Sequence, residues 1–335
     1  MQVSSFPDVR KFSALRERGA ELKREVSNAF RELTTGRLTT EDSIRNLNGK
    51  IGDAHLMRRE LDKVEIRKGS FSFALTRASI VQNSLDLVVS SIGSLPEEIR
   101  SAIGRQDQKS LEISEQTARS ALDQVVSALN VRHGSRYLFS GDGVDAAPIA
   151  SAETIINSVR TASASATTAA DLNVALDALF GPGGEFESTL YRGGSGELPP
   201  VEIAEGDRVS LSTKADDQSV RDVIRGLVTA IVTDDLGLAV SERDEVLRGS
   251  GDLMVKGIDG VSRNIASIGL AEQRLDTARM RLIAEESVLN DAYNAMTGRD
   301  PFDAASRAQE LEALLQTTYT VTARLAALSF NNFIR

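Results

Sequence analysis

The chain has 335 residues, enough for two or three domains with their own cores. Its net charge of −9, from 48 acidic and 39 basic residues, argues against nucleic acid as a partner, because phosphates require a basic surface. Cysteine is absent, which excludes disulfides, a thiolate nucleophile and cysteine-based zinc sites. Only 4% of the residues are aromatic, so aliphatic side chains must do most of the packing, as they do in helical bundles.

The first third of the chain has a helical pattern. Residues 7–33 predict one helix that ends at Gly36, residues 53–95 predict a second, and residues 107–132 predict a third. Pro96 either ends the second helix or starts a short turn after it. The first helix carries an apolar or small residue every three or four positions, at Phe12, Leu15, Gly19, Leu22, Val26, Ala29 and Leu33. This spacing keeps one face of the helix against a partner helix.

The composition changes after residue 141, where glycine, proline, serine and threonine become frequent. Val201 and Ile203 alternate with polar residues, 205–207 form a turn, and Val209 and Leu211 follow, which predicts a β-hairpin. A helix with five inward apolar residues comes next, at Val220, Val223, Ile224, Leu227 and Ile231. Residues 142–250 are therefore predicted to form a small mixed domain.

A helical pattern resumes near Leu253 and runs to Thr297. Gly298 and Pro301 then break the pattern before the last helix. The last helix has its own stripe, at Leu311, Leu314, Thr318, Val321, Leu325 and Leu328. Two such helices at opposite ends of the chain predict an antiparallel pair that also packs against further copies. The predicted assembly seam consists of Phe12, Leu15, Leu22, Val26, Leu33, Leu311, Leu314, Val321, Leu325 and Leu328.

The predicted fold is mainly α with an inserted α+β domain, built as a terminal antiparallel coiled coil and an elongated helical bundle. Residues 1–38 and 300–335 would form the coiled coil, 39–141 and 251–299 the bundle, and 142–250 the middle domain with its hairpin.

The sequence shows no assembled catalytic chemistry. His55 and His133 are far apart and stand in no metal-binding spacing, so we expect helix-end or surface histidines. The glycine clusters at 181–184 and 193–196 lack the lysine and hydroxyl residue of a phosphate loop. We therefore expect no enzyme activity, no cofactor and no metal. No apolar run is long enough to span a membrane, and the first seven residues do not resemble a cleaved secretory signal.

Four segments resemble one family. Residues 136–141 resemble the Tyr-Leu-Phe-Ala/Ser-Gly motif of the flagellar hook-associated protein 3 family, and 268–275 resemble a segment in the returning helix of flagellins. Residues 33–37 resemble the end of the family's first helix, and 191–194 resemble a middle-domain turn. Residues 41–44 depart from the family, which usually has a proline-containing stretch there. The family-motif residues are Tyr137, Leu138, Phe139, Gly141, Gly269 and Arg274.

The resemblance implies an extracellular structural protein of the bacterial flagellum that joins hook to filament. It implies export through the flagellar type III apparatus without a cleaved signal, with the help of an export chaperone. It also implies a homo-oligomer that contacts a neighbouring hook-associated protein and flagellin. Flagellin, the filament subunit, is the alternative, and residues 137–141 favour the junction family. A cytosolic enzyme and a coiled-coil adaptor are further alternatives, disfavoured by the missing catalytic groups and by the inserted domain.

Overall fold

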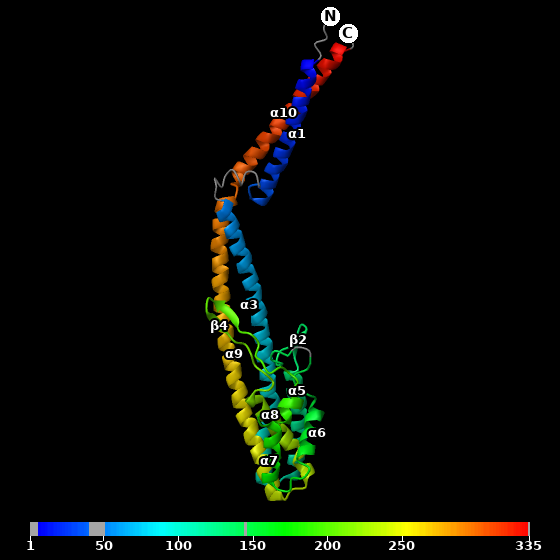
Figure 1. Cartoon of the computed structure of the whole chain (residues 1–335), viewed down its shortest axis with the longest axis vertical. Helices are drawn as coiled ribbons and strands as arrows, with labels where there is room; N and C mark the ends of the chain where they lie inside the picture. Colours follow the sequence, from blue (N-terminus) through cyan, green and yellow to red (C-terminus); the bar gives the residue numbers. More distant parts are fainter. Residues whose placement is uncertain (1–5, 40–50, 144–145, 334–335) are drawn as a thin grey trace. The chain divides into compact units, whose positions relative to one another are not determined.

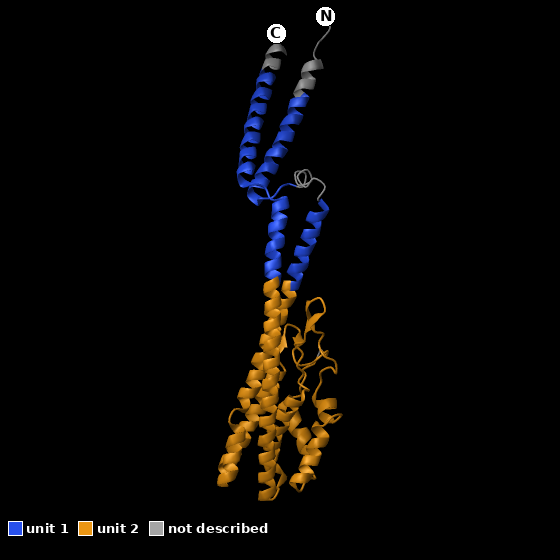
Figure 2. Ribbon diagram, turned by 90° about the vertical axis from the view of Figure 1, so that its left-hand side faces the viewer, with its two compact units in different colours: residues 1–67, 282–335 blue, residues 68–281 orange. Residues whose placement is uncertain are grey.

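The computed structural model describes residues 6–39, 51–143 and 146–333, with side chains at the outermost helix ends left aside. The predicted departure from the family at 41–44 lies outside the described residues. The fold is mainly α, as predicted (Figure 1). The chain divides into two compact units, residues 1–67 with 282–335 and residues 68–281 (Figure 2). This division is coarser than the three predicted domains, which stay a prediction.

The first unit contains the terminal helices α1 (Phe6–Thr35) and α10 (Pro301–Phe333). They run antiparallel, because an antiparallel bridge joins Arg37 to Gly298 where one helix ends and the other is about to begin. Gly36 ends α1 with a left-handed φ of 65° and donates its N–H to the Glu32 carbonyl at 2.8 Å. The first part of α3 (Ile51–Ile92) and the last part of α9 (Val240–Thr297) complete this unit.

The second unit is a helical bundle with two small hairpins. The remaining part of α3 lies beside the remaining part of α9 (Figures 1 and 2). Between them in sequence come α4 (Leu95–Arg105), α5 (Gln108–Leu129), α6 (Ala152–Ala162), α7 (Ala169–Phe180), the one-turn π-helix η1 (Phe186–Leu190), α8 (Gln218–Val232) and the 3-10 turn η2 (Asp234–Leu236). The strands are β1 (Arg132–His133) with β2 (Arg136–Tyr137), and β3 (Val201–Ala204) with β4 (Asp207–Val209), both pairs antiparallel. The second pair confirms the predicted hairpin.

Helix α8 supplies the centre of this bundle. It packs against α5, α6 and α7, and its predicted inward residues are all buried. Helix α8 lies close to α9 because each helix has a glycine, with no side chain, at the point of contact. A Cβ at Gly226 would lie 2.7 Å from Cγ of Met254, and a Cβ at Gly257 would lie 2.8 Å from the Val223 backbone nitrogen.

Several element predictions were wrong. The second helix ends at Ile92, and the segment after Pro96 is a further helix, α4, whose first turn holds that proline where a missing N–H costs nothing. Helices α6 and α7 were missed, although Ser151 caps the first and a Thr168–Asp171 capping box opens the second. Helix α9 begins at Val240 rather than Leu253, because buried Val246 and Leu247 secure a stretch whose glycines disfavour helix.

Candidate assembly surface

The terminal helices form a small apolar core where α1 contacts α10. Leu22 of α1 and Leu311 of α10 are buried in it. Small side chains accompany them, since Ala29 and Ala308 are also buried and let the two backbones approach. The half-buried Val26 and Leu315 complete the cluster.

The predicted seam is divided between this contact and solvent. Leu22 and Leu311 are buried, and Leu15 and Val26 are half-buried. Four other seam residues are exposed: Leu33, Leu314, Val321 and Leu325. The side chains of Phe12 and Leu328 lie outside the described residues. The role of these residues in assembly stays a prediction.

Helix α10 carries two apolar stripes, and only one faces α1. Ala304, Ala308, Leu311 and Leu315 repeat at spacings of four and three, and all are buried or half-buried. We call Leu314, Val321 and Leu325 the outer stripe; their exposed fractions are 47%, 42% and 38%. Both stripes fit a heptad, so spacing alone could not tell which one faces α1.

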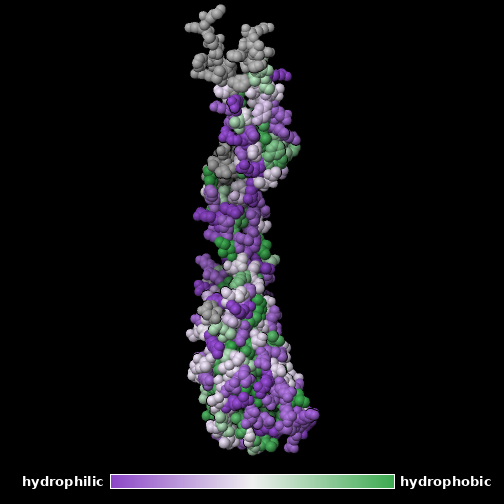
Figure 3. All heavy atoms as spheres, turned by 90° about the vertical axis from the view of Figure 1, so that its right-hand side faces the viewer, coloured by the Kyte–Doolittle hydropathy of each residue, from purple (hydrophilic) through white to green (hydrophobic). Residues whose placement is uncertain are grey.

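Exposed apolar side chains also occur on α1, where Phe30 is 44% and Leu33 is 37% exposed. Elsewhere apolar patches lie among hydrophilic side chains on the face shown in Figure 3. Burying a leucine, valine or phenylalanine side chain fully contributes about 1.5–3 kcal/mol. The outer-stripe residues are already more than half buried, so a partner that covers them would gain less than half of this free energy from each.

The family-motif segment 137–141 forms a buried corner in the second unit. Leu138 and Phe139 are 3% and 0% exposed, as expected for a packing corner. The Leu138 N–H donates to the Val131 carbonyl at 3.1 Å, and the Phe139 carbonyl accepts from the Ala215 N–H at 2.9 Å. The corner thus ties the end of α5 to the segment that leads into α8. Tyr137 is half-buried, and the Arg132 guanidinium lies 5.0 Å from its ring centre.

Glycines let a second loop pack against this corner backbone to backbone. Gly141 has a φ of 60°, and a Cβ there would lie 2.5 Å from the Gly196 carbonyl oxygen. The Gly194 N–H donates to the Ser140 carbonyl at 2.8 Å, and the Gly196 N–H donates to Oδ1 of Asp142 at 3.0 Å. The cluster at 193–196 is therefore a structural contact of the corner.

Tyr191 closes the corner. Its hydroxyl donates to the Gly194 carbonyl at 3.0 Å. Burial, together with the nearby carboxylates of Asp216, Asp142 and Asp217, raises the pKa of Tyr191 to about 12, so the phenol stays protonated and remains a donor. Burial also raises the pKa of Asp216, and the Arg221 guanidinium at 2.6 Å opposes that shift.

The remaining motif residues lie on α9. The Arg274 guanidinium forms an ion pair with Asp207 at 2.6 Å, which fastens the β3–β4 hairpin to the helix. Gly269 faces α3, where a Cβ would lie 3.4 Å from Nε2 of Gln82. Beside it, burial raises the pKa of Glu272, and a hydrogen bond from Gln82 opposes that shift.

The part of the chain that the structure describes contains no group of three or more His, Cys, Asp or Glu side chains that could hold a metal. His55 is exposed, and the His133 ring stacks on Phe73 with centres 4.9 Å apart. None of the described helices is both long and apolar enough to cross a membrane.

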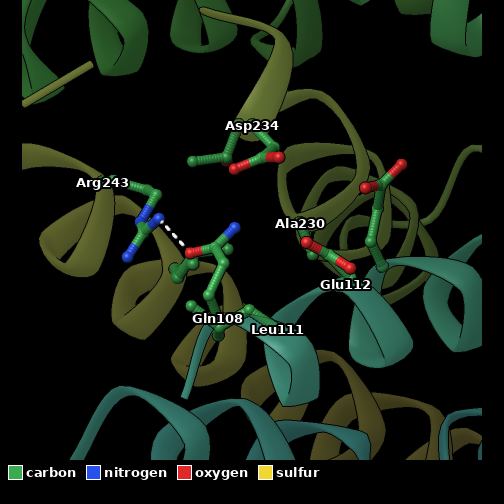
Figure 4. Close-up of a pocket in the computed structure, with 9 residues that line it drawn as sticks. Gln108, Leu111, Glu112, Ala230, Asp234 and Arg243 are labelled. Atoms are coloured by element: carbon green, nitrogen blue, oxygen red, sulfur yellow. Dashed lines mark hydrogen bonds between the residues drawn. The ribbon is translucent and has the colours of Figure 1, made fainter. Parts of the chain in front are cut away.

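A small cavity between α5 and the α8–α9 connection has polar walls (Figure 4). Gln108 and Arg243 hydrogen bond across it at 2.5 Å, and Glu112 and Asp234 also line it. Its volume is about 20 Å³. That volume is close to the roughly 10–15 Å³ needed for one water molecule, so the cavity has no room for a substrate.

The comparison with family models gives one match. The family described as the bacterial flagellin C-terminal helical region matches residues 253–333. Residues 253–333 are therefore similar to a flagellin C-terminal helical region. This region takes in α9 from residue 253 and all of α10, so the outer stripe lies inside it. A search of the curated proteins finds no match to the chain.

The solved structures that resemble the chain include two flagellar proteins. FlgL from Bacillus cereus is 15% identical, with 66% of this chain and 97% of that chain covered and a TM-score of 0.45. A Vibrio parahaemolyticus protein assigned as a flagellar hook-associated protein is 16% identical, with coverages of 77% and 98% and a TM-score of 0.49.

Proposed function

We propose that this chain is a structural subunit of the bacterial flagellum that joins hook to filament and assembles through its terminal helices. It works by packing against copies of itself and against a neighbouring hook-associated protein and flagellin. Export through the flagellar type III apparatus, with an export chaperone, belongs to the same proposal. No catalytic step is part of this function.

The observation that carries the proposal is the outer stripe inside the flagellin C-terminal region. Leu314, Val321 and Leu325 are exposed on α10 although the helix already uses another face to contact α1. A helix with apolar residues on two faces is stable in water only when both are covered. Further subunits would cover the second face. The sequence motif at 137–141 supports the junction protein over flagellin.

Localisation tests this function directly. Antibody or tag labelling of isolated flagella should give a narrow band at the end of the hook. Labelling along the whole filament would instead identify a flagellin, and absence from flagella would refute a flagellar role.

Variants of the outer stripe test the assembly mechanism. Val321→Asp should leave the protein folded and exported but prevent its incorporation, because a carboxylate cannot be buried unpaired. Thr320→Asp, at a neighbouring exposed position, is the matched control and should be incorporated normally. Deleting the residues after Gln316 should likewise abolish incorporation, while circular dichroism still shows the fold of the second unit. Normal incorporation of the Val321 variant would refute the outer stripe as the contact.

A further inference from the structure

A compact group of one aromatic and three basic residues lies where the β1–β2 hairpin meets α3. Phe73 and Arg77 are four residues apart on α3 and therefore share one side of the helix. His133 pairs with Arg136 across the hairpin, which puts both side chains on one face of it. The His133 ring stacks on Phe73, so that face is turned towards the helix. We call Phe73, Arg77, His133 and Arg136 the basic knob.

The basic knob contains nitrogen atoms without hydrogen-bond partners. Nε and Nη2 of Arg77 and Nδ1 of His133 are buried and make no hydrogen bond. No carboxylate of the described residues forms an ion pair with Arg77 or Arg136, and burial followed by the Arg136 charge lowers the pKa of Arg77. Two arginines that lie near each other without an acidic partner repel each other, and this repulsion destabilises the protein when nothing is bound there. Arg136 is exposed, so an external carboxylate that pairs with it would offset this repulsion.

The knob also has the composition of an interface centre. Phe73 is 61% exposed in a chain with only 11 phenylalanines. Aromatic and arginine side chains dominate binding energy at protein interfaces, where they fill pockets in the partner. The exposed Phe73 ring beside the exposed Arg136 guanidinium therefore suits a partner with a hollow and an acidic edge.

The same unit offers such a hollow at the junction of α4 and α5. It has a volume of about 300 Å³, whereas a cavity of roughly 150 Å³ is enough to bind benzene. Ile113, which is 55% exposed, lines it together with Glu97 and Glu98. Glu97 already pairs with Arg100 at 3.0 Å, but Glu98 only accepts from the Ser94 hydroxyl at 2.6 Å. Arg105 is the one basic residue among those that line the hollow.

We propose that the basic knob of one copy docks into the α4–α5 hollow of a second copy, with Phe73 against Ile113 and Arg136 facing Glu98. The knob and the hollow are different surfaces, since Phe73 and Ile92 are separated by about 28 Å of helix. A contact between unlike surfaces is heterologous, and repetition of it builds rings or filaments. This inference rests on the proposed function, because a flagellar subunit must make such repeating contacts.

Disulfide cross-linking tests the contact with little background, because the chain has no cysteine. The full-length double variant Phe73→Cys with Ile113→Cys should, on oxidation of assembled flagella, give a ladder of cross-linked dimers and larger species. The matched control is Phe73→Cys with Val174→Cys, which uses an equally exposed apolar position and should give no ladder. A missing ladder in flagella that contain the double variant would overturn the inference and leave the proposed function intact. Absence of the unmodified protein from flagella would instead refute the proposed function.

Charge exchange tests the recognition. Arg136→Glu and Glu98→Arg, each added to the cysteine pair, should reduce the ladder about tenfold, the effect of losing one central interface contact. Combining them should restore it, because the attraction is then reversed but present. Arg208→Glu, an exposed arginine of β4, should leave the ladder unchanged. Equal ladders in all four variants would show that the charges do not hold the copies together.

Discussion

Substitution of glycine by alanine is expected to change the free energy of unfolding in opposite directions at two positions of α9. Replacing glycine by alanine inside a helix favours folding by about 1 kcal/mol, because alanine loses less backbone entropy. At Gly249 an added Cβ would meet nothing within 4 Å. Gly249→Ala should therefore raise the free energy of unfolding by about 0.5–1 kcal/mol.

At Gly257 the same Cβ would lie 2.6 Å from Cγ2 of Val223, 2.8 Å from its nitrogen and 2.9 Å from the Ser219 carbonyl oxygen. Two of these three atoms are backbone, so α8 would have to move away from α9. Overpacking of this kind costs about 1–3 kcal/mol and here lies at the upper end, because backbone cannot rotate aside. After the helix gain is subtracted, Gly257→Ala should lower the free energy of unfolding by about 2 kcal/mol.

Urea unfolding followed by circular dichroism measures both changes, and an unchanged m-value would show that the cooperative unit is the same. Gly249→Ala is the control for Gly257→Ala, since both lie inside one helix and gain the same propensity. If both variants were stabilised, or both destabilised alike, the close α8–α9 contact would not be what requires Gly257.

Three further predictions concern the second unit. Phe139→Ala should lower the free energy of unfolding by about 3–5 kcal/mol, because the ring is fully buried; a loss below 1 kcal/mol in thermal melting would show that the corner contributes little. Tyr191→Phe should cost about 1 kcal/mol by removing the hydrogen bond to Gly194, and an unchanged melting temperature would contradict that role. Hydrogen bonds from Thr168 and Thr167 lower the pKa of Asp171 below its ordinary 3.8, so the carboxylate stabilises α7 above that pH and loses this effect as pH falls through the folded-state value. Asp171→Asn should therefore be less stable than the parent chain at pH 7 and equally stable at strongly acid pH; a difference that persisted in acid would assign the effect to something other than charge.

Local signals were sufficient for the helices with long periodic patterns and for one hairpin. The β3–β4 hairpin followed from alternation around a glycine turn, and the inward face of α8 followed from five apolar residues at helical spacing. Gly36, Gly298 and Pro301 gave the ends of α1, α9 and α10 because their effect on the backbone is local. Helices α6 and α7 were missed because the stretch between them, residues 163–168, is rich in serine and threonine and is typical of a loop. Their N-terminal capping residues are common in loops as well, so these residues mark a helix start only when the helix itself is already known.

The sequence by itself determined that this is a mainly helical chain with paired terminal helices. Periodicity and composition are properties of neighbouring residues, so they can be read without a structure. Only the tertiary structure decided which stripe of α10 contacts α1 and which stays exposed, because both stripes share the heptad spacing. It also decided where Gly257 touches α8 and where Arg77 approaches Arg136. These contacts join residues far apart in the chain, and no local pattern records which distant side chains a fold brings together.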